Sequence, residues 1–206
     1  MPEILEVAII ITDRNLQELD RGHWVLGGFS REELEALGEF HKANFRDAGL
    51  GGNFPPLVGY SGGNGLFSDV LTSRLSAEDV EKEVMRIVTQ HCPPGECPLV
   101  GYSVQCDREV LKDKMPRLYR HLSHQIIDVS GFFTVARLWL PEQWQYWDRK
   151  SSDYNHRAVN DVEDAIEALR WVRNKFFSES LLPLGIAQGY SSSGLSALSL
   201  PGISRK

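Results

Sequence analysis

The sequence predicts an α/β domain in which a mixed sheet is flanked by helices on both sides. Short β-branched or apolar runs alternate with amphipathic helical patterns after an initial hairpin. A length of 206 residues with 42% hydrophobic content fits one domain with a substantial core. The net charge of −6 argues against a broad basic surface for nucleic acid. It leaves open an enzyme that grips a short nucleic acid through metal ions.

The N-terminal part predicts a hairpin followed by a helix. Residues 4–11 form a β-branched run typical of a buried strand, and residues 16–26 predict the returning strand. Ser30 and Glu33 have the spacing of a capping box. The buried face of the helix that follows is expected to comprise Leu34, Leu37 and Phe40.

Residues 47–65 break the pattern with seven glycines and the pair Pro55-Pro56. This composition predicts a loop, which we interpret as an insertion. The glycine spacing matches neither a Walker loop nor a dinucleotide-binding fingerprint, so a phosphate site is not favoured.

The second half alternates helices and strands. Ser76 is expected to start a helix that Pro93 stops, and residues 99–104 and 125–129 are the next strands. A helix bearing Leu111 and Met115 separates them, and Ser130 is expected to cap the helix that follows. Three aromatic residues lie in the loop beyond it: Trp144, Tyr146 and Trp147. Cys92 and Cys97 flank a turn, which indicates free thiols in a reducing compartment.

The C-terminal stretch differs in composition from the rest. Residues 178–206 are rich in Ser, Gly and Leu with almost no charge, which predicts a largely disordered tail after a domain of residues 1–177. No apolar run approaches the length of a membrane span, and no signal peptide is recognisable. We therefore expect no membrane association and an intracellular location.

Residues 152–161 lead into the clearest helix of the chain, whose apolar stripe begins at Val162. His156 and Asp161 lie at the start of this helix. A carboxylate there can hold a metal ion, while an imidazole can take a proton from water. The alternative is structural, because Asn160 with Glu163 has the spacing of a capping box.

Several segments in order resemble the oligoribonuclease family of 3′→5′ exoribonucleases, which have four catalytic acids and a histidine on an RNase H-like fold. The resemblance covers roughly residues 3–177. It rests on four segments, namely residues 4–13, 93–107, 126–130 and 156–162. His-Arg-Ala-Val-Asn-Asp-Val, residues 156–162, resembles the family's His-x-Ala-x-Asp-Asp-Ile motif.

The resemblance implies phosphodiester hydrolysis of short RNA oligonucleotides at two Mg²⁺ or Mn²⁺ ions. Asp107 matches the third acid and Asp161 the fourth, both as metal ligands. His156 matches the general base that deprotonates the attacking water. A homodimer in the cytoplasm or mitochondrion is also implied.

The sequence departs from the family at its start. The family's first strand reads Asp-Leu-Glu-Met-Thr-Gly-Leu and supplies two acids, whereas this sequence begins Met1-Pro2-Glu3. That strand would lie centrally, between the strands of residues 4–11 and 99–104. We expect these two strands to close up, or another segment to fill the gap. Substrate-binding positions also differ, with His124-Gln125 in place of Tyr-Arg and Tyr102 in place of Asn.

Half of the metal ligands are thus absent from the chain as given, which predicts impaired activity. Either the given sequence is a gene model or isoform that lacks its first segment, or the chain is a decayed relative. Two alternatives stay open. The chain is a non-catalytic relative that acts as a nucleic-acid-binding or dimerisation module, or it is an ordinary α/β domain with coincidental motifs.

Overall fold

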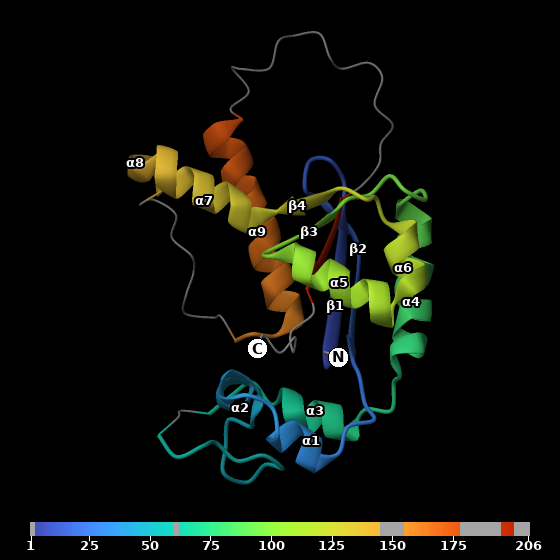
Figure 1. The fold of residues 1–206 in the computed structure, drawn as a ribbon, viewed down its shortest axis with the longest axis vertical. Helices are drawn as coiled ribbons and strands as arrows, with labels where there is room; N and C mark the ends of the chain where they lie inside the picture. The colour runs from blue at the N-terminus through green and yellow to red at the C-terminus, as the bar shows by residue number, and fades with distance from the viewer. Residues whose placement is uncertain (1–2, 60–61, 145–154, 178–194, 200–206) are drawn as a thin grey trace.

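The computed structural model describes residues 3–59, 62–144, 155–177 and 195–199. Their centre is a mixed sheet with the strand order β2-β1-β5-β3-β4, which confirms the predicted α/β class (Figure 1). The strands are β1 (Glu6–Thr12), β2 (Glu18–Val25), β3 (Leu99–Gly101), β4 (Ile126–Asp128) and β5 (Leu195–Ser199). The predicted hairpin is confirmed as the antiparallel pair of β1 and β2.

Helices cover both faces of this sheet. They are α1 (Arg31–Glu35), α2 (Glu39–Phe45), α3 (Leu66–Thr72), α4 (Ala77–His91), α5 (Val104–Lys114), α6 (Pro116–His121), α7 (Val129–Trp139), α8 (Pro141–Trp144) and α9 (Ala158–Phe176). Figure 1 shows α4 and α6 to the right of the strands, α9 to the left, and α1–α3 together at the lower end. None of the helices in the described part of the chain has an apolar stretch that could span a bilayer.

Strand β1 is the centre of the core because all seven of its residues are buried. Its alternate side chains enter two different clusters. Val7, Ile9 and Ile11 pack with residues of α4, α5 and α6, whereas Ala8 and Ile10 pack with α9. A third cluster, with Phe45, Phe54 and Phe67 at its centre, holds α1–α3 together. Because both faces of β1 are covered, its β-branched run is continuous rather than alternating with polar residues.

The central position of the sheet is filled by β5. This strand runs antiparallel to β1 and parallel to β3. The expectation that another segment fills the gap is therefore confirmed. The prediction of disorder is wrong for residues 195–199, because a short uncharged segment gains main-chain partners on both sides. Residues 178–194 and 200–206 of the predicted tail lie outside the described residues.

Three boundaries differ from the predictions. The expected helix after Ser30 divides into α1 and α2 at Gly38, which leaves Phe40 55% exposed instead of buried. The strand expected over residues 99–104 ends at Gly101, because Ser103 has a positive φ of 51° and turns the chain into α5. The helix expected to start with Ser130 is capped by Asp128, whose side chain accepts the Ser130 N–H.

The glycine-rich stretch between α2 and α3 forms no helix or strand in its described part, as predicted for a loop. Phe54 is buried at its centre, and two hydrogen bonds connect it to Asp47. The loop is thus anchored to the core of α1–α3. Cys92 and Cys97 are buried on either side of the predicted turn, and neither forms a disulfide within the described residues. Tyr146 and Trp147 lie outside the described residues.

Candidate active site

The start of α9 is held by a carboxylate from the first strand. The helix begins at Ala158, and its N-cap residue Arg157 makes no side-chain capping bond. Instead, Glu6 of β1 accepts the Ala158 N–H at 2.8 Å. The predicted capping box of Asn160 and Glu163 is therefore wrong, because Asn160 lies inside the first turn. A buried anion at a helix N-terminus is favoured by the helix dipole.

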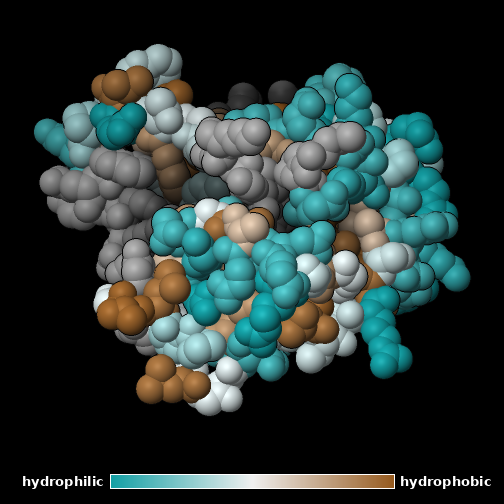
Figure 2. Space-filling model, turned by 60° about the horizontal axis from the view of Figure 1, so that its bottom comes forward, coloured by the Kyte–Doolittle hydropathy of each residue, from teal (hydrophilic) through white to brown (hydrophobic). Residues whose placement is uncertain are grey.

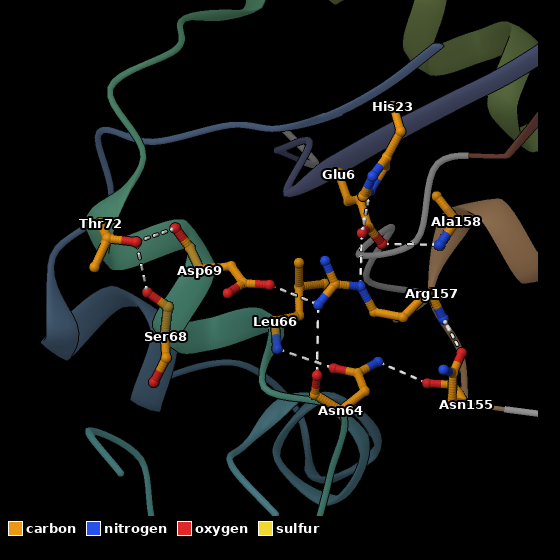
Figure 3. A network of polar contacts seen from close by, with 10 residues as sticks. All are labelled: Glu6, His23, Asn64, Leu66, Ser68, Asp69, Thr72, Asn155, Arg157 and Ala158. Carbon is orange, nitrogen blue, oxygen red and sulfur yellow. Dashed lines mark hydrogen bonds and ion pairs between the residues drawn. The ribbon is translucent and has the colours of Figure 1, made fainter. Parts of the chain in front are cut away.

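Glu6 is also the centre of a charged network, shown in Figure 3. Its Oε1 accepts the Arg157 Nε–H at 2.7 Å and lies 2.7 Å from His23 Nε2. The glutamate is fully buried, and burial alone raises its pKa. The hydrogen bonds from His23 and the Ala158 N–H, with the charge of Arg157, outweigh burial and hold the pKa of Glu6 below its usual range.

Arg157 connects this network to α3. Its Nη1 donates to Asp69 Oδ2 at 2.7 Å and to the Asn64 carbonyl at 3.4 Å. Asn64 Nδ2 in turn donates to the Asn155 carbonyl at 2.6 Å. The chain on both sides of His156 is thus bound to the segment that leads into α3 (Figure 3).

His156 lies between these anchored residues with a positive φ of 56°. A left-handed backbone is uncommon for a residue other than glycine and costs free energy, so the surrounding contacts must hold it. The half-buried imidazole meets the ring of Phe40 edge to face, with 5.1 Å between the ring centroids. The network therefore fixes where His156 presents its side chain.

The two candidate acids lie in the first turns of two helices. Asp161 is in the first turn of α9, and its N–H donates to the Arg157 carbonyl at 3.1 Å. Asp107 is buried in the first turn of α5. The turn before α5 is fixed by the Ser103 N–H, which lies within bonding distance of Asp128 Oδ1 at 2.9 Å and Ser130 Oγ at 3.0 Å.

The structure places His156 and Asp161 at one helix start and Asp107 at another. Helices α5 and α9 pack on opposite faces of the sheet. Within the described part of the chain, no three His, Cys, Asp or Glu side chains form a group that could hold a metal ion. The donors present do not fit a two-ion site, so the roles of Asp107 and Asp161 as metal ligands stay predictions.

Sequence reasoning missed the residues that build this site: Glu6, Asn64, Asp69, Arg157 and Phe40. One signal was available for Glu6, the only charged residue in the apolar run of residues 4–11. A charge in a buried strand needs a partner, although the sequence does not say which one. Phe40 gave the opposite signal, because its helical spacing predicted burial.

Comparison with known proteins finds relatives that match most of this chain. The chain is 31% identical to the human mitochondrial oligoribonuclease over 179 residues, 87% of this chain and 68% of that protein. It is equally similar to the bovine mitochondrial oligoribonuclease, with 86% of this chain and 67% of the relative covered. The oligoribonuclease of Corynebacterium efficiens is 31% identical over 84% of this chain and 71% of its own length. No family model matches the chain.

Proposed function

The chain belongs to the oligoribonuclease family, and from this premise we propose that it is a 3′→5′ exoribonuclease type of hydrolase acting on short RNA. The start of α9 is the centre of its site. The observation that carries this proposal is the Glu6–Arg157 pair, which holds the start of α9 where His156 contacts the exposed ring of Phe40.

Phe40 gives this site a means of holding an RNA end. Its ring is 55% exposed and contacts His156. A base stacked on an aromatic side chain gains about 1–3 kcal/mol, largely independent of sequence. In Figure 2 the α1–α3 end comes forward, and its surface is largely hydrophilic with separate hydrophobic groups. A short RNA can be held by stacking on one ring. An acidic protein can therefore bind it without a long basic groove.

The proposed roles follow from the chemistry of each group. A neutral imidazole at His156 can accept a proton from water, and Asp161 and Asp107 offer the carboxylate oxygens that Mg²⁺ and Mn²⁺ prefer. These two carboxylates do not make a complete two-ion site within the described residues. We therefore propose that hydrolysis by the chain as given is strongly impaired, whereas RNA binding through Phe40 is retained.

A labelled short RNA tests both the retained binding and the impaired hydrolysis. Fluorescence anisotropy measures binding, and a gel assay in Mn²⁺ measures shortening of the RNA. We expect Phe40→Ala to weaken binding about tenfold, since about 1.4 kcal/mol of stacking corresponds to that factor. Phe177→Ala is the matched control, because Phe177 is equally exposed at 56% but lies at the end of α9. Equal binding by both variants would contradict the proposed site.

The second candidate, a non-catalytic relative that binds nucleic acid, is favoured by the incomplete donor set. Prolonged incubation of the protein with the labelled RNA distinguishes an impaired enzyme from a non-catalytic relative. An impaired enzyme shortens the RNA slowly and loses this activity in His156→Ala and Asp161→Ala, whereas Asp113→Ala at the exposed end of α5 retains it. A non-catalytic relative produces no shortening in any variant. Rapid shortening by the unaltered chain would overturn the proposed impairment.

We include a homodimer and a cytoplasmic or mitochondrial location in this proposal, since the human and bovine relatives are named as mitochondrial. Exposed apolar side chains on α7, Leu138 and Trp139, offer a surface for self-association. Sedimentation at micromolar concentration tests this part. A monomer would contradict it without affecting the assignment of the RNA site.

A further inference from the structure

The sheet is divided into two halves that only β5 joins. Strand β1 pairs with β2 on one side and with β5 on the other. Strand β3 pairs with β4 and with β5. Among the described strands, β1 and β3 do not pair with each other. Without β5, the sheet would consist of a hairpin and a separate parallel pair.

An empty position between β1 and β3 would be costly. Every residue of β1 is buried, and β3 is buried along its whole length. Backbone N–H and C=O groups along the facing edges would then lack partners where water has little access. Unpaired edges of this kind recruit other strands.

We propose that the slot between β1 and β3 is a binding site for an extended strand, and that residues 195–199 of the same chain are its ligand. Recognition is mainly through the main chain. Ala197 occupies the middle of the slot, level with Ile10 of β1 and Val100 of β3. The Leu-Ser-Ala-Leu-Ser sequence of β5 has no charge to bury and no proline to interrupt a two-sided ladder.

The pairing is unequal on the two sides. Five residues of β5 are in register with β1, but only two are in register with β3. If β5 were lost, the β3–β4 pair should therefore separate from the β1–β2 hairpin. Strand β5 also packs against α9 and α5, whose first turns bear Asp161 and Asp107. Occupation of the slot thus sets how the two candidate acids lie relative to each other, whatever reaction they serve.

Hydrogen exchange of the full chain tests this inference without any assay of RNA. Ala197→Pro removes the central N–H and should accelerate exchange at residues 8–12 and 99–100. Ser204→Pro, outside β5, is the control and should leave this exchange unchanged. A synthetic peptide of residues 193–201, added in excess to the Ala197→Pro variant, should restore the protection. Equal exchange in the two proline variants would overturn the proposal.

Cross-linking provides a test that does not require a destabilised variant. Ile10 and Ala197 are directly opposite each other, and opposed residues of an antiparallel pair lie within the Cα separation of a disulfide. The double variant Ile10→Cys and Ala197→Cys should form an intramolecular disulfide under mild oxidation. Ile10→Cys with Glu109→Cys, which lies exposed on α5, is the control and should remain reduced. A cross-link no more frequent than in the control would refute the strand assignment, and an intermolecular cross-link would refute its origin in the same chain.

Discussion

The starts of α9 and α5 each bear a candidate acid, and each is held by a carboxylate from elsewhere in the chain. At α9 the carboxylate is Glu6, which is fully buried and surrounded by Arg157, His23 and a backbone N–H. At α5 it is Asp128, which is partly buried and accepts two backbone N–H groups, those of Ser103 and Ser130.

The two helix starts differ in whether the carboxylate binds a charged or a neutral partner, and in how strongly each start depends on that single carboxylate. Glu6 is a buried anion paired with Arg157, so its removal leaves Arg157 compensated by the half-exposed Asp69 rather than by a buried carboxylate. Asp128 bonds neutral donors near the surface, which water can satisfy in its absence. The α9 start should therefore be rigid and sensitive to single substitutions, whereas the α5 start should tolerate them better.

The largest expected effect is that of Glu6→Gln. The substitution keeps the shape but removes the charge opposite Arg157, which should lower the free energy of unfolding by about 3 kcal/mol or more. Chemical denaturation at neutral pH measures this loss. Glu3→Gln is the control, because the exposed Glu3–Lys114 pair should contribute less than about 1 kcal/mol. Similar losses in both variants would contradict the role assigned to Glu6.

Acid should remove the same contribution. The pKa of Glu6 is lowered in the folded state, so its stabilisation is complete above the pH where an unfolded glutamate titrates, about 4.3. The stabilisation is lost as the pH falls through the lower, folded-state pKa. Unfolding free energies of the unaltered chain and of Glu6→Gln should therefore converge below about pH 4. If the two unfolding free energies instead changed in parallel with pH, the pKa of Glu6 would be the same in the folded and unfolded states.

Asp128→Ala tests the α5 side of the comparison. It removes the N-cap of α7 and one acceptor of the Ser103 N–H, so we expect a loss of about 1–2 kcal/mol. Urea denaturation provides the measurement. Asp113→Ala, at the exposed C-terminal end of α5, should change stability by less than about 0.5 kcal/mol. A loss at Asp128 as large as that of Glu6→Gln would remove the distinction between the two helix starts.

The smallest effects are expected at two helix starts: α4, which has a capping box of its own, and α9, where the predicted capping box does not form. Ser76 and Asp79 make a complete capping box at α4, so Ser76→Ala should cost about 1 kcal/mol. Asn160→Ala should have an effect within about 0.5 kcal/mol, because Glu6 satisfies the start of α9 in its place. Thermal unfolding of the two variants gives the ranking, and a greater loss at Asn160 would restore the capping interpretation.

Elements specified by their own residues could be predicted from the sequence. The capping boxes of Ser30 and Ser76 are local, since each joins residues three positions apart. The burial of β1 follows from its continuous β-branched run, and the apolar stripe of α9 follows from helical periodicity. The α/β class and the family were predictable for the same reason, because motifs are short and contiguous, whereas the roles of His156, Asp161 and Asp107 stay predictions.

Only the tertiary structure decided what residues far apart in the chain do together. Glu6 and Ala158 are 152 positions apart, yet their hydrogen bond decides where α9 begins. Residues 195–199 have no periodic signal of their own and become a strand because β1 and β3 present unpaired backbone groups on both sides. Local propensity and periodicity are properties of neighbouring residues, whereas the partner of a buried charge or an open strand edge is set by the folded chain as a whole.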